Sequence, residues 1–300
     1  MAGFQTSRVA RIGDRHKRRR RYSLTKQSMK TKTKSKIQVA LTSSLFLACS
    51  VFGQVTITND SDTFIANDNS SSGVSATSPQ GSATSLSMRV YPNGPRFRVT
   101  VVSFDLAGLT GSFTGAELEF QFLTAQNNTR TINLLGVGAN YGNVSESTLD
   151  YANAPFILQP ADSGPAYNGG SFEFIGGALN TLPTTLGASF TDGSGNTVVE
   201  NVASFSNGSG STGVKTFSGT TLESFLASAS ASDPDYVTFI IANTINSSDS
   251  AYTIASKEAA GDTPIQLILP NMEPVPEPAT LALLGVGGLV AAWQIRRRKV

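Results

Sequence analysis

Short runs of alternating apolar and polar residues fill the middle of the chain, and they constrain its fold more than any other feature. In the run ELEFQFL at 117–123, nearly every second residue is apolar. A period of two places apolar side chains on one face of a β-strand, whereas a helix needs a period of 3.6. Similar runs lie at 55–58, 63–65, 97–106, 131–137, 172–175, 198–205, 236–242, 252–256 and 265–269. So many short strands, separated by Gly, Asn, Ser and Pro, predict an all-β fold with two sheets packed as a sandwich.

Three segments of this region have a different pattern. Thr220–Ala229 (TTLESFLASA) has apolar residues at helical spacing behind a threonine, which predicts one short helix across one end of the sandwich. The Ser-rich stretch Asn67–Ser87 predicts a loop. Tyr236–Ala242 (YVTFIIA) is almost continuously apolar, which predicts a strand buried on both faces.

Charge divides the chain into three parts. Residues 1–54 contain 13 basic and 1 acidic residue, residues 55–270 contain 6 and 18, and residues 271–300 contain 4 and 2. We therefore expect a signal region at 1–54, one β-sandwich domain at 55–270 and a C-terminal signal at 271–300. Phosphates would repel the acidic middle, so we expect no nucleic-acid partner.

The N-terminal part has the order of features of an export signal. Four lysines at 30–36 precede the apolar stretch 37–52, which predicts an N-terminal signal helix, with a buried helix as the alternative. The small residue Gly53 then predicts cleavage before Gln54. The arginines at 18–21 lie upstream of this signal. They favour Met29 as the true start, over an unusually long charged region or a nucleic-acid arm.

The C-terminal part is an apolar run between a proline motif and a basic cluster. Ala279–Ile295 spans about 17 residues, close to the lower limit for a transmembrane helix. Trp293 at its end suits the membrane interface. The basic cluster predicts that this end stays in the cytoplasm, and it consists of Arg296, Arg297, Arg298 and Lys299. The motif before the helix consists of Val275, Pro276, Glu277 and Pro278, and its prolines cannot continue a helix.

These three features together resemble the PEP-CTERM sorting signal of Gram-negative-type bacteria, over residues 275–299. The resemblance implies processing by an exosortase, a membrane transpeptidase-like enzyme, in bacteria that make extracellular polysaccharide. It implies an exported protein with an inner-membrane intermediate, which then reaches the cell surface or extracellular matrix. A plain tail anchor would explain the helix and the arginines but not Pro-Glu-Pro.

The body between the two ends also resembles a known module. Five segments match in order: DTFI at 62–65, VSFDL at 102–106, AELEF at 116–120, ESTLDYANAP at 146–155, and SKE to PIQL at 256–267. They resemble the DNRLRE-type domain, a jelly-roll module related to carbohydrate-binding modules. The resemblance implies a jelly-roll-like sandwich. A tryptophan that is usual in the fourth segment is absent, and Tyr151 stands near its place.

The middle of the chain lacks histidine and cysteine, since His16 and Cys49 both lie upstream. A Ser-His-Asp triad, a Cys-His pair and a His/Cys zinc site are therefore impossible there. The obvious carboxylate pair is Glu117 and Glu119, two residues apart on the polar side of one strand. This position favours a solvated surface over carboxylate-pair chemistry on glycans. We expect no enzymatic activity and no catalytic residues.

No cofactor or metal site is predicted, although a structural calcium ion is an open alternative. Calcium prefers oxygen ligands such as carboxylates and backbone carbonyls. Four acidic residues fall in segments that we expect to meet near a sheet edge: Asp60, Asp62, Asp105 and Glu258. Acidic residues at strand ends are more often only solvated.

Sugar binding commonly uses exposed aromatic rings, and the middle of the chain has tyrosines but no tryptophan. Tyr141, Tyr151 and Tyr167 fall in loop-like sequence and are candidates for exposure. Tyr236 and Tyr252 belong to predicted strands. Together these features predict an exported, non-catalytic surface or extracellular-matrix protein that associates with exopolysaccharide. A purely structural or adhesive surface protein and a glycan-active enzyme are the alternatives.

Overall fold

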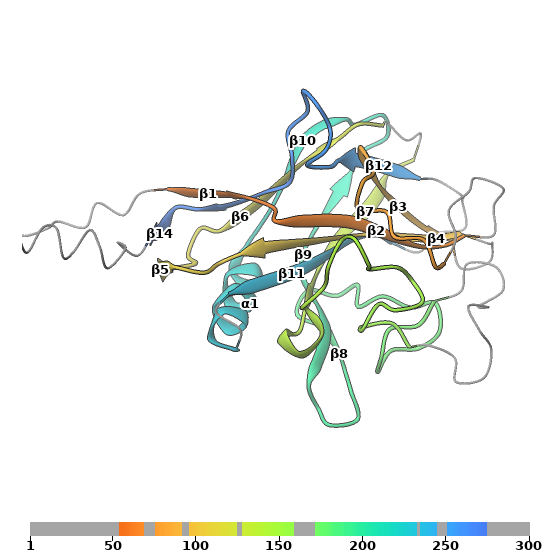
Figure 1. Ribbon diagram of the computed structural model, residues 1–300, viewed down its shortest axis with the longest axis horizontal. Helices are drawn as coiled ribbons and strands as arrows, with labels where there is room; N and C mark the ends of the chain where they lie inside the picture. Colours follow the sequence, from red (N-terminus) through yellow and green to blue (C-terminus); the bar gives the residue numbers. More distant parts are fainter. Residues whose placement is uncertain are drawn as a thin grey trace, which may run out of the picture. The chain divides into compact units, whose positions relative to one another are not determined.

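The computed structural model describes residues 54–68, 76–91, 96–124, 128–158, 172–232, 235–244 and 251–274. The predicted signal helix, the sorting motif and the predicted transmembrane helix lie outside these residues. No helix within them is long and apolar enough to cross a membrane. They form two antiparallel sheets and one short helix (Figure 1). The predicted all-β sandwich is therefore confirmed.

The first sheet is organised around strand β6. Its strands are β1 (Val55–Thr58), β13 (Gln266–Leu269), β6 (Glu117–Phe122), β10 (Gly213–Ser218), β12 (Tyr252–Ala255) and β3 (Ser85–Tyr91). Strand β6 pairs with β10 on one side and with β13 and β12 on the other. Strand β13 pairs in turn with β1, and β12 pairs with the first half of β3.

The second sheet contains the longest strands. Its hydrogen-bonded order is β2 (Ser61–Asp68), β4 (Arg96–Asp105), β11 (Tyr236–Asn243), β7 (Arg130–Val137), β9 (Thr197–Asn207) and β8 (Ser189–Thr191). The second half of β3 pairs with β4, so β3 passes from one sheet into the other. The remaining elements are a small two-stranded antiparallel sheet of β5 (Leu109–Ser112) and β14 (Asn271–Pro274), the 3-10 turn η1 (Ala139–Tyr141) and α1 (Thr220–Ser232).

The main core lies between the two sheets. The predicted inward face of β6 is confirmed, since Leu118, Phe120 and Phe122 are at most 1% exposed. The ring of Phe120 stacks on that of Phe217 from β10, with 5.4 Å between centroids. Phe104 and Phe239 of the second sheet belong to the same core. Burial of so many large rings is the main stabilising contribution to this sandwich.

A second core covers the outer face of the second sheet. Alternate residues of its strands, such as Leu135 and Ile240, pack there against side chains of the connection between β7 and β8. This connection contributes Leu149, Tyr151, Ala154, Phe156, Ile157, Phe172, Phe174 and Leu182. Both faces of β11 are therefore covered from Val237 to Ala242, as predicted, but the prediction was wrong for Tyr236, which begins the predicted run and is exposed.

Two predictions about local structure were wrong in part. Phe172–Ile175 forms no strand and makes only an isolated bridge from Phe174 to Ile157, because its rings pack into the second core while its backbone stays irregular. The predicted loop Asn67–Ser87 was too long at both ends. Strand β2 continues to Asp68, and β3 begins at Ser85.

Helix α1 confirms the predicted short helix and continues to Ser232. Its buried side chains Leu222, Phe225, Leu226 and Ala229 face the main core. Gly136 of β7 allows this approach, because a Cβ atom there would lie 2.4 Å from the Phe225 ring. At one end of the sandwich, β14 lies against β1, so the first and last strands are neighbours (Figure 1).

Candidate functional site

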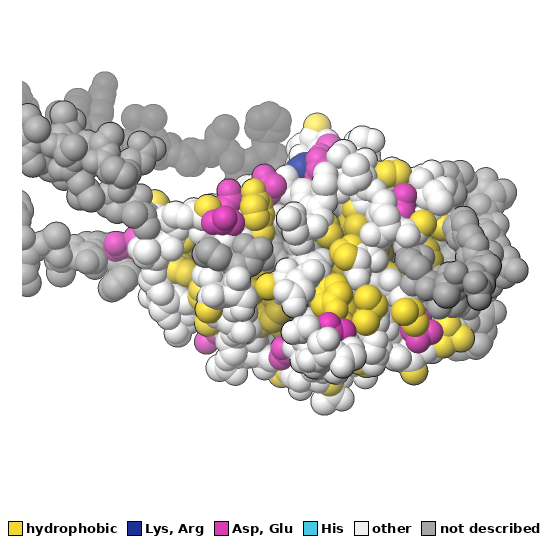
Figure 2. Space-filling model, turned by 60° about the horizontal axis from the view of Figure 1, so that its bottom comes forward, with side chains coloured by type: hydrophobic (Ala, Val, Ile, Leu, Met, Phe, Trp, Pro, Cys, Tyr) yellow, Lys and Arg dark blue, Asp and Glu magenta, His cyan; other side chains and the backbone are white. Residues whose placement is uncertain are grey.

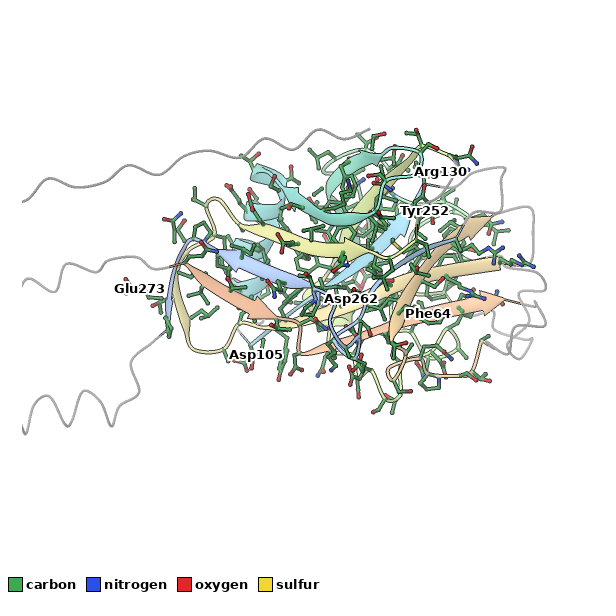
Figure 3. The ribbon with its side chains drawn as sticks, turned by 90° about the horizontal axis from the view of Figure 1, so that it is seen from above. Phe64, Asp105, Arg130, Tyr252, Asp262 and Glu273 are labelled. Carbon is green, nitrogen blue, oxygen red and sulfur yellow. The ribbon has the colours of Figure 1, made fainter. Side chains whose placement is uncertain are left out.

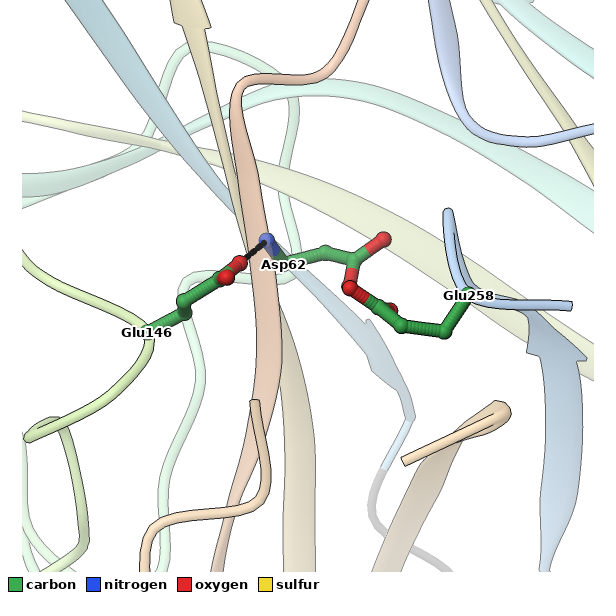
Figure 4. A group of neighbouring side chains, drawn as sticks. All are labelled: Asp62, Glu146 and Glu258. Carbon is green, nitrogen blue, oxygen red and sulfur yellow. Dashed lines mark hydrogen bonds between the residues drawn. The ribbon is translucent and has the colours of Figure 1, made fainter. Parts of the chain in front are cut away.

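Three carboxylates from distant parts of the chain meet beside strand β2 (Figure 4). Asp62 lies on β2, Glu146 lies after η1, and Glu258 lies after β12. One carboxylate oxygen from each side chain lies within 4.8 Å of the corresponding oxygens of the other two. We call these three residues the acidic cluster.

Asp62 is the buried centre of the acidic cluster, with 1% of its surface exposed. Its Oδ2 accepts hydrogen bonds from Asn59 Nδ2 and from the backbone N–H of Lys257, both at 2.8 Å. Its own backbone N–H donates to Glu146 Oε2 at 3.0 Å. Its second oxygen, Oδ1, is buried without a hydrogen-bond partner among the described residues. The residue therefore joins β2 to two other segments while half of its carboxylate stays unsatisfied.

Electrostatics in the cluster oppose a full negative charge on Asp62. Burial raises the pKa of Asp62 to about 6, and the negative charge of Glu258 adds to this effect against the opposing hydrogen bond from Lys257. The Lys257 ammonium pairs with Glu146 Oε2 at 2.6 Å. Burial alone would lower the pKa of Lys257, but the pairing with Glu146 and the negative charges of Asp62 and Glu258 together outweigh it and raise this pKa. One ammonium therefore faces three carboxylates.

The structure brings together only two of the four acidic residues considered for calcium. Asp62 and Glu258 meet, whereas Asp60 contributes a backbone carbonyl that accepts from Lys257 Nζ at 2.6 Å. Asp105 lies apart at the end of β4 (Figure 3), where its exposed carboxylate accepts the N–H of Ala107. Sequence reasoning missed Glu146, which is 84 residues from Asp62 in the chain.

An open groove of about 370 Å³ adjoins the acidic cluster and shares Glu146 with it. Its lining is mostly polar: Asp60, Ser61, Ser103, Gly142, Asn143, Val144, Ser145, Glu146, Ser147 and Tyr236. Tyr236, the first residue of β11, is 43% exposed. The groove therefore presents hydroxyl, amide and carboxylate groups beside one accessible aromatic ring.

The tyrosines differ from what the sequence suggested. Tyr151 was a candidate for exposure, but it is 1% exposed and packs edge-on against Phe97 in the second core. Tyr141 is partly exposed, and its hydroxyl donates to Asp192 Oδ2 at 2.7 Å. Tyr252 is buried in its strand as predicted, and Tyr167 lies outside the described residues.

The carboxylate pair on β6 lies where the sequence placed it. Glu117 is exposed and Glu119 is partly exposed on the outer face of the strand. Their side chains alternate with the buried residues of the main core, which supports the interpretation of this pair as solvated surface.

A comparison with protein families identifies the C-terminal end of the chain. Residues 274–298 match the PEP-CTERM protein-sorting motif. No significant match is found among curated proteins. The match confirms the resemblance of the C-terminal end, whereas the resemblance of the body to the DNRLRE-type domain stays a prediction. The chain is thus an exported protein with a sorting motif that implies exosortase processing at the membrane, before release to the cell surface.

Proposed function

We propose that this protein is a non-catalytic component of the cell surface or extracellular matrix and that its sandwich associates with exopolysaccharide. The C-terminal match supports the destination. In this proposal, the N-terminal signal is removed at Gly53, and the C-terminal helix holds the chain in the inner membrane. An exosortase then acts at the Pro-Glu-Pro motif, and the body reaches the surface.

The groove beside Tyr236 is the observation that carries the glycan proposal. Sugar rings present apolar faces and hydroxyl edges, and a binding site needs both an apolar surface and directional polar groups. The accessible ring of Tyr236 can supply the first. Ser61, Asn143 and Ser145 can supply the second, since hydroxyl and amide groups both donate and accept hydrogen bonds.

The negative charge of the groove and of the domain surface limits which polysaccharides can bind. Asp60 and Glu146 line the groove, and acidic residues outnumber basic ones by 18 to 6 between residues 55 and 270. Acidic side chains also outnumber basic ones on the face drawn in Figure 2. Such a surface repels uronic or sulfated polysaccharides. We therefore propose a neutral or amino-sugar polysaccharide as the ligand.

Two features support a role without catalysis. The region between residues 55 and 270 has no histidine or cysteine. Glu146, a carboxylate of the groove wall, holds Lys257 and the N–H of Asp62. These contacts give Glu146 a structural role that competes with use as a general acid or nucleophile.

A pull-down assay tests this function. The full chain, kept in mild detergent, is incubated with insoluble neutral glycans and with an acidic glycan as comparison, and the depleted fraction is measured. Tyr236→Ala should weaken binding by about tenfold or more. Leu186→Ala is the matched control, since Leu186 is also an exposed large apolar residue, at 55%, and does not line the groove.

The two alternative functions give different results in the same assay. New reducing ends or unsaturated products would indicate a glycan-active enzyme. A chain that reaches the cell surface but binds no glycan would indicate a purely structural or adhesive protein. Equal binding by the Tyr236 and Leu186 variants would exclude the groove as the binding site.

A further inference from the structure

Buried oxygen atoms without hydrogen-bond donors occur at the acidic cluster. Asp62 Oδ1 and Glu258 Oε2 are two of them, although each belongs to a carboxylate. Asn59, only 4% exposed, donates to Asp62 through Nδ2, while its own Oδ1 has no partner within the part of the chain that the structure describes. A buried acceptor without a donor loses the hydrogen bonds that water would have supplied. Several buried acceptor oxygens close together would be stabilised by a positively charged group that they share.

We infer that Asp62, Glu146 and Glu258 bind a divalent cation, and that this cation is Ca²⁺ rather than Mg²⁺. Figure 4 shows the Asp62 and Glu258 carboxylates directed toward one another on one side of β2, while Glu146 reaches the backbone N–H of Asp62 from the other side. Their ligand oxygens lie within 4.8 Å of one another, which a central ion can bridge with bonds of about 2.4 Å, the length of a Ca²⁺–O bond. Mg²⁺ demands a near-ideal octahedron and gives up its water reluctantly, so carboxylates supplied by three separate segments suit Ca²⁺ better.

The local charge also fits a divalent ion. Among the described residues, Lys257 is the cation in contact with the cluster, with its ammonium on Glu146 Oε2 and on the carbonyl of Asp60. Three carboxylates and one ammonium leave two negative charges, which one Ca²⁺ would neutralise.

The ion would join three segments that lie far apart in the chain. These are strand β2, the segment around Glu146 and the turn after β12. Two of them also form the wall of the groove beside Tyr236. Calcium would therefore act on the stability of this edge of the sandwich, whether or not the groove binds a glycan.

Thermal unfolding tests the inference without any glycan. The full chain in mild detergent is stripped with EDTA at a pH of about 7.5, and its unfolding is followed by circular dichroism with Ca²⁺, with Mg²⁺ or with chelator. A hundredfold excess of Ca²⁺ over its Kd should raise Tm by about 5–10 °C for a domain of this size. Mg²⁺ at the same concentration should raise it less.

Two variants make the result specific. Glu258→Gln should abolish the calcium response, yet in EDTA it should be at least as stable as the natural chain, because a charge next to Asp62 is removed. Glu117→Gln is the control, since it removes an exposed carboxylate of β6 outside the cluster, and it should keep the full response. Asp62→Asn replaces Glu258→Gln if that variant does not fold.

Three results would overturn the inference. The natural chain could show no change of Tm in millimolar Ca²⁺, or the cluster variant could keep the full calcium response. Tm in EDTA could also fall between pH 5 and 7.5 with no recovery in Ca²⁺, which would show that Asp62 and Glu258 share a proton instead of a metal ion.

Discussion

Replacement of Asp62 by Asn should change how the stability of the sandwich depends on pH. Burial raises the pKa of Asp62 from 3.8 to about 6 in the folded chain, whereas unfolding returns it to its ordinary value. The folded state therefore favours the protonated carboxyl. Its contribution to the unfolding free energy is complete below about pH 4 and is lost as the pH rises through about 6. A difference of about two pKa units corresponds to about 3 kcal/mol.

Urea unfolding in EDTA measures this effect. The free energy of unfolding is determined for both chains at several pH values between 4 and 8. The amide introduced by D62N cannot ionise but can still accept the hydrogen bonds from Asn59 and Lys257, so D62N should gain about 3 kcal/mol relative to the natural chain between pH 4 and 7. Asp105→Asn, which changes an exposed carboxylate in a local turn, should show no comparable gain.

A constant difference between D62N and the natural chain across this pH range would refute the reasoning. It would mean that Asp62 titrates at its ordinary pKa and that its burial is relieved in solution. Comparison of the two chains at each pH cancels the titration of all other groups, so the result depends on Asp62 and on its coupling to Glu258.

Three further predictions concern the core, the helix and the tail. Phe120→Ala should lower the unfolding free energy by about 3–5 kcal/mol and Glu119→Ala by no more than about 0.5 kcal/mol in urea, and equal losses would contradict the strand faces. Gly136→Ala should cost about 1–3 kcal/mol, because its Cβ would lie 2.4 Å from the Phe225 ring, and Phe225→Leu in the same chain should recover part of this loss. Replacement of residues 276–278 by Ala should leave an unprocessed chain in the inner membrane, and mass spectrometry that finds the natural chain at the surface with its tail attached would count against processing.

Much of the fold could be predicted because strand alternation is a local signal. The buried face of β6 and the double burial of β11 both follow directly from the order of apolar residues. Strand β10 was missed because Gly and Ser surround its short VKTF run, and its assignment depends on pairing, with Phe217 opposite Leu118. The ring of Phe174 packs into the second core, on the outer face of the second sheet. This packing depends on tertiary contacts, so no periodic pattern in the sequence predicts it.

The candidate site was less accessible to sequence reasoning. Asp62 and Glu258 could be selected as acidic residues near strand ends, but Glu146 joins them only through the path of an irregular connection. Exposure of a tyrosine is likewise a tertiary property. Tyr236 begins a strand and is exposed, whereas Tyr151 lies in a loop and is buried in the second core. Only the positions of neighbouring segments distinguish these cases.

The contact between β1 and β14 affects how this domain could fold during export. A body whose first and last strands are neighbours can complete folding while both of its flanking segments are still held in one bilayer, because neither end has to be pulled across the domain. If both termini are attached to the membrane as proposed, removal of one attachment would leave the domain attached through the other at the same end of the sandwich. In both states the opposite end of the sandwich would lie farthest from the membrane, first with two attachments to it and afterwards with one.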